Sequence, residues 1–186
     1  MKIFIRKSLI SKREKLDKNY VKSYSESLSK IFIESDIFKE SSVVMSYVSF
    51  KGEFDTNFIN KEILNNNKTL LLPKIYSNSN MKAFKVKDLT GLNRNKFGIL
   101  EPIESEELSP DLVIIPGVAF DYEKNRIGFG AGFYDKFLEK LDRNSVKIIA
   151  LAYDFQILET IPKEDHDIPI DLIYYLDKNN KLTIVK

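Results

Sequence analysis

The sequence contains no cysteine and no tryptophan, and His166 is its only histidine. The absence of cysteine excludes disulfide bonds, thiolate catalysis and cysteine-ligated metal sites. The chain therefore has no need of an oxidising compartment. His166 has neither the partners of a catalytic triad nor the spacing of a metal ligand, so we interpret it as incidental.

Long hydrophobic runs and an excess of one charge are also missing. The first ten residues, MKIFIRKSLI, contain only short apolar runs, and no later segment approaches the roughly 18 apolar residues of a membrane span. The 29 basic and 27 acidic residues nearly cancel, which argues against a nucleic-acid or membrane-surface binder. We expect a cytoplasmic, monomeric protein whose weak basic bias suits a small anionic ligand.

The composition that is present suits one folded domain. Of the 186 residues, 43% are hydrophobic and 12% aromatic, which is enough to fill a core, and no repeat or long linker divides residues 1–186. Apolar residues at helical spacing predict two N-terminal helices, over 3–16 and 18–33, with Asp17 as the N-cap between them. Further helices are predicted over 56–67 and 133–142.

Compact β-rich runs alternate with these helices. Strands are predicted over 42–48, 68–76, 81–86, 111–117, 146–153 and 171–176. The second should stop near Pro73, the third is half-exposed, and the continuous apolar run of 111–117 suits a central strand buried on both faces. This alternation predicts an α/β fold, a three-layer α/β/α sandwich whose sheet is mainly parallel, with antiparallel strands allowed at its edges.

The segment RIGFGAGFYDKFLEK, residues 126–140, places glycine at positions 128, 130 and 132 just before a predicted helix. Glycine permits positive φ and close approach to the backbone, and a helix start offers free N–H donors. Together these features favour a phosphate. The spacing matches neither the Walker A motif nor the dinucleotide fingerprint, so a tight loop without a ligand remains an alternative from the pattern alone.

The longer stretch IIPGVAFDYEKNRIGFGAGFYDKFLEK closely resembles the signature of the 5-formyltetrahydrofolate cyclo-ligase family, also called methenyltetrahydrofolate synthetases. Five other pieces resemble family motifs in the same order: KIFIR (2–6), YVSFKGEFDT (47–56), LLPKIY (71–76), FGILEP (97–102) and DHDIPID (165–171). The resemblance covers nearly the whole chain. Small departures occur at Ile5, Ala131 and Phe133. Lys74, where arginine is frequent, matters most because lysine cannot make a bidentate guanidinium contact.

The resemblance implies an enzyme of one-carbon metabolism with ATP as co-substrate and Mg²⁺ as cofactor. Such an enzyme converts 5-formyltetrahydrofolate and ATP to 5,10-methenyltetrahydrofolate, ADP and phosphate. The γ-phosphoryl group passes to the formyl oxygen, N10 attacks the activated carbon, and phosphate leaves. The protein's tasks are then to position two ligands and to neutralise phosphate charge.

The resemblance also assigns roles to residues. Catalytic roles fall to Arg126, Gly130 and Tyr134, and magnesium contacts to Asp135 and Asp167. ATP contacts fall to Lys2, Ile3, Phe4, Ile5, Arg6, Arg126, Ile127, Gly128, Phe129, Gly130, Ala131, Gly132, Phe133 and Tyr134. Folate contacts fall to Val48, Glu53, Phe129, Gly130, Ala131, Gly132 and Phe133, with Glu53 accepting hydrogen bonds from the pterin.

Other interpretations remain open for the residues and for the chain. Arg126, Lys2 and Arg6 could be solvated charges, Asp135 a first-turn residue favoured by the helix dipole, and Phe129 or Tyr134 part of the core. For the chain, the alternatives are an enzyme of the same fold acting on a phosphosugar or a CoA ester, a folate-binding protein without activity, and a nucleic-acid binder.

Overall fold

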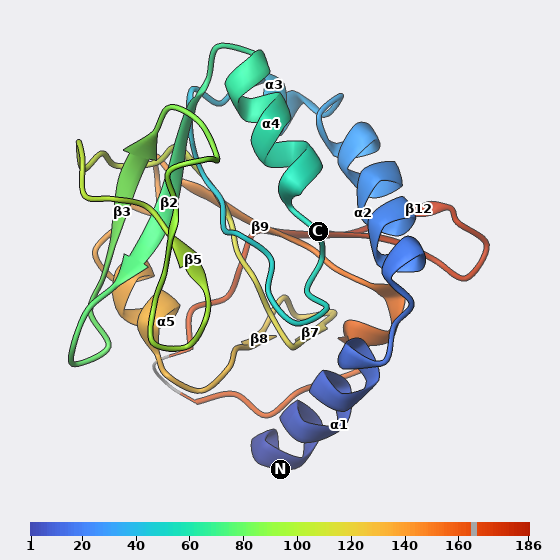
Figure 1. Ribbon diagram of the computed structural model, residues 1–186. Coiled ribbons are helices and arrows are strands. Elements are labelled where there is room, and N and C mark those ends of the chain that lie inside the picture. The colour runs from blue at the N-terminus through green and yellow to red at the C-terminus, as the bar shows by residue number, and fades with distance from the viewer. Residues whose placement is uncertain (165–166) are drawn as a thin grey trace.

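A computed structural model describes residues 1–164 and 167–186 and is built around a seven-stranded sheet (Figure 1). The strand order is β12-β11-β9-β6-β1-β2-β3, in which β11, β9, β6, β1 and β2 are parallel and the edge strands β12 and β3 are antiparallel to their neighbours. The strands are β1 (Val43–Met45), β2 (Thr69–Ile75), β3 (Met81–Val86), β6 (Leu112–Ile114), β9 (Lys147–Leu151), β11 (Leu172–Leu176) and β12 (Leu182–Val185). The predicted parallel sheet with β6 at its centre is confirmed.

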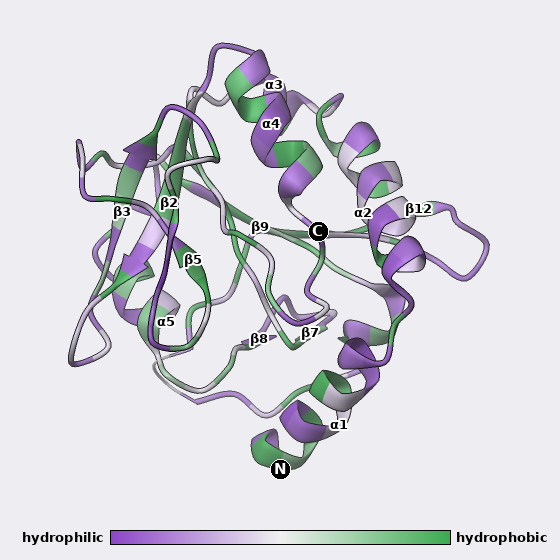
Figure 2. Ribbon diagram, viewed as in Figure 1, coloured by the Kyte–Doolittle hydropathy of each residue, from purple (hydrophilic) through white to green (hydrophobic). Residues whose placement is uncertain are grey.

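Three helices cover one face of this sheet: α2 (Lys18–Phe32), α3 (Asp36–Glu40) and α4 (Asn57–Asn65). Asp17 caps α2 as predicted, since its carboxylate accepts hydrogen bonds from the amides of Asn19 and Tyr20. Figure 2 shows α2 and α4 banded in hydrophilic and hydrophobic residues, while the central strands are mostly hydrophobic. The buried side of α2 (Tyr24, Leu28, Phe32) joins the core against β9 and β11.

The opposite face of the sheet is covered by fewer helices. It carries α5 (Phe133–Leu138) and a three-stranded sheet of order β10-β7-β8, formed by β7 (Ala119–Asp121), β8 (Arg126–Ile127) and β10 (Ile157–Leu158). Phe137 and Leu138 of α5 and Phe120 of β7 pack here against Val113 and Ile148 of the large sheet. The predicted third layer is therefore present, but it is part helix and part sheet.

Helix α1 (Lys2–Glu14) covers neither face of the large sheet. Its apolar residues Ile5, Leu9 and Ile10 pack instead on a small cluster that includes Ala119 and Ile127 of the three-stranded sheet. Figure 1 shows α1 set apart below the sheet, near β7 and β8. Of the helices in the described part of the chain, none has the length and apolarity that a membrane crossing requires.

Several sequence expectations need correction. Strand β2 does not stop at Pro73 but continues to Ile75. Its pairing with β1 ends at Leu71, so beyond that residue no strand on the β1 side requires a backbone N–H, which Pro73 lacks. Pairing with β3 on the other side continues to Ile75. The amide of Ile75, on the β1 side, donates to the Glu101 carboxylate instead. The helix predicted over 133–142 ends at Leu138, and the strand predicted over 111–117 covers only 112–114.

The short elements were not predicted. They are α3, the hairpin formed by β7 and β8, strand β10, the final strand β12, a single turn of 3-10 helix at Asp154–Gln156, and a pair of two-residue strands, β4 (Asn93–Arg94) and β5 (Leu100–Glu101). Segments of two to five residues carry too little periodicity to be recognised from sequence.

The carboxyl ends of β1, β6 and β9 come together on one side of the sheet. The Tyr153 hydroxyl, just after β9, donates to the backbone carbonyl of Glu53, in the segment after β1, at 3.3 Å. Gln156 donates to the carbonyl of Gly117, after β6, at 2.9 Å. In an open α/β sheet this is the side on which ligands bind.

One buried hydroxyl joins α2 to two parallel strands and allows a test of the fold. The Tyr24 hydroxyl lies within hydrogen-bond distance of the carbonyls of Ala152 and Leu176 and accepts from the amide of Leu176. Tyr24→Phe leaves these buried groups without their partner, and we expect a loss of about 1–3 kcal/mol in the free energy of unfolding, measured by urea titration. Tyr20→Phe, at a site 42% exposed, is the control. Equal stability of Tyr24→Phe and wild type would contradict the assigned role.

Candidate active site

The glycine segment, residues 128–132, is bounded by two guanidinium groups. A Cβ at Gly128 would lie 2.6 Å from Nη1 of Arg126, and a Cβ at Gly130 would lie 3.1 Å from Cζ of Arg6. Gly130 and Gly132 also have positive φ, of +95° and +68°. The alternation of glycines is thus required partly by the backbone and partly by two neighbouring positive charges.

Arg6 reaches the segment from α1. Its Nε donates to the carbonyl of Gly128 at 2.8 Å, which fixes the guanidinium beside Gly130. Gly130 and Ala131 are exposed, so this backbone and the Arg6 side chain form a basic surface open to a ligand. The structure thus brings Arg6, one of the N-terminal residues predicted to contact ATP, next to the glycine segment.

Arg126 lies beneath the same segment. Its side chain is 4% exposed, and Nη2 forms an ion pair with Oδ1 of Asp135 at 2.6 Å, while Nη1 donates to the carbonyl of Pro116. Its Nε is buried without a hydrogen-bond partner among the described residues. The residue predicted for phosphate is therefore paired with the residue predicted for magnesium.

Lys2 and Asp167 form a second pair of the same kind. Nζ of Lys2 lies 2.6 Å from Oδ2 of Asp167 and 3.4 Å from a carboxylate oxygen of Glu164. Again a residue predicted for ATP contacts a residue predicted for magnesium. His166 lies outside the described residues.

The other N-terminal residues predicted to contact ATP differ in their exposure to solvent. Ile3 and Phe4 are 66% and 78% exposed, whereas Ile5 packs against the small sheet. A shared role of these side chains in one nucleotide site stays a prediction.

Glu53 is buried at the carboxyl side of the sheet, in the segment after β1. Its carboxylate accepts from the amide of Phe50 at 2.9 Å and lies 3.9 Å from Nη1 of Arg13. Burial raises the pKa of Glu53 to about 7, although Arg13 and the Phe50 amide both lower it. Val48, the other residue predicted from this segment for folate, is half-buried.

Arg13 itself was not predicted as a functional residue. Its side chain is 2% exposed, and its guanidinium lies 5.0 Å from the ring centroid of Phe129 in the glycine segment. A usable signal was present, because Arg13 follows Arg6 by seven residues and Lys2 precedes Arg6 by four, which places all three on one face of a helix. This stripe was not recognised because the helix also contains lysines outside it, so its basic residues resembled ordinary solvated charges.

Two aromatic residues of the glycine segment and α5 differ in exposure. Phe129 is 49% exposed, so one part of its ring is free to contact a ligand. The Tyr134 hydroxyl is buried without a hydrogen-bond partner in the described part of the chain, and the Arg126 guanidinium lies 5.9 Å from its ring centroid. Burial and the nearby Glu53 carboxyl raise the pKa of Tyr134 well above its ordinary value, so its hydroxyl is neutral.

The acidic residues that the structure describes do not form a metal site by themselves. Within residues 1–164 and 167–186, no group of three or more acidic or histidine side chains is placed to hold an ion. A magnesium ion bound through Asp135 or Asp167 would therefore take most of its ligands from phosphate and water. Mg²⁺ commonly binds in this way, with one or two carboxylates. The available oxygen donors fit that pattern.

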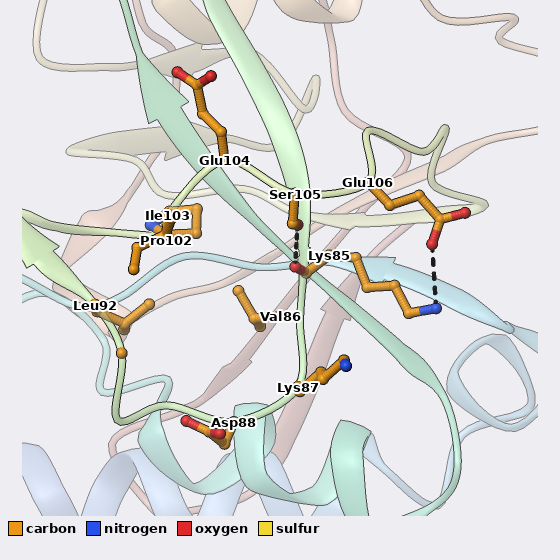
Figure 3. Close-up of a pocket in the computed structure, with 11 residues that line it drawn as sticks. Lys85, Val86, Lys87, Asp88, Leu92, Pro102, Ile103, Glu104, Ser105 and Glu106 are labelled. Carbon is orange, nitrogen blue, oxygen red and sulfur yellow. Dashed lines mark hydrogen bonds and ion pairs between the residues drawn. The ribbon is translucent and has the colours of Figure 1, made fainter.

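A cavity of about 470 Å³ lies elsewhere, between the end of β3 and the two segments 87–92 and 102–106 (Figure 3). Val86, Leu92, Pro102 and Ile103 supply apolar lining, and Lys85 pairs with Glu106 at 3.3 Å. None of the residues predicted for the site lines this cavity. The cavity and the glycine segment are thus separate features.

Comparison with known proteins agrees with the motifs. The model of the 5-formyltetrahydrofolate cyclo-ligase family matches residues 1–176. The 5-formyltetrahydrofolate cyclo-ligase of Haemophilus influenzae is 32% identical over 139 residues, covering 71% of this chain and 74% of that protein. The mitochondrial 5-formyltetrahydrofolate cyclo-ligase of Arabidopsis thaliana is 33% identical over 199 residues, covering 91% and 70%.

A solved structure has the same fold. The NMR structure of Aquifex aeolicus 5,10-methenyltetrahydrofolate synthetase superposes with a TM-score of 0.83 at 33% identity, covering 97% of this chain and 91% of that one. Together, the match over nearly all residues and the shared sheet agree with the assignment from the glycine signature. The chain belongs to the 5-formyltetrahydrofolate cyclo-ligase family of enzymes.

Proposed function

We propose that this chain closes 5-formyltetrahydrofolate to 5,10-methenyltetrahydrofolate with MgATP, in a site formed by the glycine segment, α1 and the segment after β1. Membership of the family makes the chain a ligase of folate metabolism. The observation that carries the proposal for the site is the glycine segment bounded by the Arg6 and Arg126 guanidinium groups. A backbone with glycine at every second position, beside two fixed cations, is suited to bind phosphate groups.

The reaction asks little covalent chemistry of the protein. The formyl oxygen takes the γ-phosphoryl group of ATP, and ADP leaves. N10 then attacks the formyl carbon and loses its proton, and phosphate departs with the former formyl oxygen. Arg6 and the backbone amides of the glycine segment bind the phosphates at the exposed surface, and Arg126 supports them from below. Alignment of the two ligands can lower the barrier by about 7–11 kcal/mol.

Glu53 supplies the contact to the folate. In its ionised form its carboxylate can accept two hydrogen bonds from the amino and ring N–H groups of the pterin. Because its pKa is about 7, this form is minor in mildly acidic solution and dominant at pH 8. Phe129, which is half-exposed and lies 5.0 Å from the Arg13 guanidinium, offers a flat apolar face to the bound ring.

Asp135 and Asp167 are the carboxylates that would hold magnesium. When bound, the ion supplies positive charge against the phosphate oxygens as the phosphoryl group transfers. In the structure each carboxylate is paired with a cation, Asp135 with Arg126 and Asp167 with Lys2. These pairs place the carboxylates next to the residues proposed for phosphate. The cytoplasmic location and the monomeric state expected from the sequence stay predictions.

A direct assay tests the proposed function. Purified protein with 5-formyltetrahydrofolate, ATP and MgCl₂ should produce the near-ultraviolet absorbance of the methenyl product. We expect no absorbance without ATP or with EDTA, because the formyl oxygen is then not activated. A flat trace from folded protein in the complete mixture would contradict the proposal. Calorimetry with ATP and the folate separately would then distinguish a folate-binding protein from an enzyme with another substrate.

Asp135→Asn tests the magnesium role. Loss of the carboxylate charge should reduce turnover by about 100-fold or more, the effect of several kcal/mol at the transition state, while folate affinity changes little. The measurements are kcat at varied MgCl₂ and the folate Kd by calorimetry. Glu139→Gln, at an exposed position that follows the same helix, is the matched control. Equal loss of turnover and of folate binding would make Asp135 a structural residue.

Gly130→Val tests the phosphate role of the glycine segment. A branched side chain at φ +95° next to the Arg6 guanidinium should displace the backbone of the glycine segment and the guanidinium from the surface proposed for the nucleotide. We expect the ATP Kd, measured by calorimetry, to rise by about tenfold or more, since one phosphate contact is worth 1.5–3 kcal/mol. Gly91→Val, at a position without positive φ and open around its Cβ, is the control. An unaltered ATP Kd in folded Gly130→Val would exclude the segment as the phosphate site.

A further inference from the structure

Two of the three guanidinium nitrogens of the buried Arg13 side chain are not accounted for by the fold. Its Nε donates to the carbonyl of Lys51 at 3.2 Å, but Nη1 and Nη2 are buried without hydrogen-bond partners among the described residues. A buried charge with unmade hydrogen bonds is unfavourable for folding. An arginine that served only the stability of α1 would be expected on its solvated side, where Lys12 and Lys15 lie.

Arg13 contacts both parts of the proposed folate site. Nη1 lies 3.9 Å from the Glu53 carboxylate, which belongs to the segment after β1. The guanidinium also lies 5.0 Å from the ring centroid of Phe129, which belongs to the glycine segment. This ring is half-exposed, so its contact with Arg13 leaves other ring surface available to a ligand. Among the pairs described, Arg13 thus connects the two segments that the resemblance assigns to folate.

We infer that Arg13 is a substrate-positioning residue of the cyclo-ligase site, which keeps Glu53 as a carboxylate and orients the Phe129 ring toward the folate. The inference rests on the proposed function and adds a residue to it. Arg13 acts through its two neighbours and does not itself contact the reacting atoms.

The ionisation of Glu53 depends on few groups. Burial raises its pKa, and Arg13 from α1 is the strongest influence in the opposite direction, followed by the Phe50 amide. The other titratable groups around it are Tyr47 after β1, Tyr134 of α5 and Tyr153 after β9. Burial raises the pKa of all three phenols, so they are neutral near pH 7. Among the described groups that act on the pKa of Glu53, Arg13 is the cation.

A purely structural role would make different predictions. The Arg13 side chain also holds the turn at residues 51–52, since its Nε donates to the carbonyl of Lys51 at 3.2 Å. If this were its only role, substitution would lower stability and weaken folate binding equally at all pH values. A positioning role through Glu53 predicts a defect that disappears at high pH.

The test is the pH dependence of 5-formyltetrahydrofolate binding, measured by calorimetry without ATP from pH 6 to 9.5. In wild type, affinity should rise through pH 7 as Glu53 ionises. In Arg13→Met the midpoint of that rise should move upward by about one pH unit or more, the usual effect of a neighbouring opposite charge. At pH 7 the folate Kd should therefore increase several-fold, and near pH 9 it should approach that of wild type.

Control variants isolate the charge. Arg13→Lys retains it and should keep the midpoint near that of wild type, and Lys12→Met removes a neighbouring exposed cation and should change nothing. Glu53→Gln should abolish the pH dependence, and adding Arg13→Met to it should produce no midpoint. ATP Kd should be unchanged throughout. Arg13→Gln serves as a second neutral variant in case Arg13→Met does not fold.

The outcomes separate the inference from the function. An active wild type with folded neutral variants that share its pH profile, or that lose the same factor in affinity at every pH, would overturn the role of Arg13 alone. A wild type that neither binds nor converts the folate would overturn the proposed function and the inference with it. An upward-shifted midpoint in both neutral variants, with Arg13→Lys near wild type, would support the role of Arg13.

Discussion

The ion pair between Arg126 and Asp135 is the interaction on which the rest of the site depends. It joins β8 to α5 at 2.6 Å, on either side of the glycine segment, with the Arg126 side chain almost fully buried. The guanidinium occupies the space that a Cβ at Gly128 would need, so the pair itself requires glycine there. Removal of either partner would leave an uncompensated charge beneath the segment. Such a change lowers the free energy of unfolding far more than loss of an exposed ion pair does.

Buried polar groups that stabilise the fold differ in their hydrogen bonding from buried polar groups around the proposed site. The Tyr24 hydroxyl in the main core has partners on two strands, as a stabilising group should. In contrast, four of the eight buried side-chain atoms without partners in the described residues belong to Arg13, Arg126 and Tyr134, around the proposed site. Unmade hydrogen bonds at that location are consistent with groups arranged for a ligand that is bound only during the reaction.

The sequence predicted the parts of the fold that carry long periodic signals. The apolar run before Pro116 identified the central strand, and Asp17 located the start of α2. The alternation of glycines indicated where the proposed phosphate surface lies. It did not show why glycine is required at position 128, which is the close approach of the Arg126 guanidinium. That approach depends on the β7–β8 hairpin, whose strands are too short to be recognised from sequence. Arg13 was missed because burial of a charge depends on tertiary contacts and cannot be read from a helix rich in lysine.

The position of α1 outside the main layers follows from the basic face that it presents. Lys2, Arg6 and Arg13 lie on one stripe of the helix, and each contacts a different part of the site: Asp167, the Gly128 carbonyl and Glu53. A helix packed on the large sheet would have used that face for apolar contacts. Packing on the small sheet through Ile5, Leu9 and Ile10 instead leaves the stripe for the site. One helix thus spans the residues proposed for magnesium, phosphate and pterin, which provides a physical reason for the two ligands to be held in a fixed relative position.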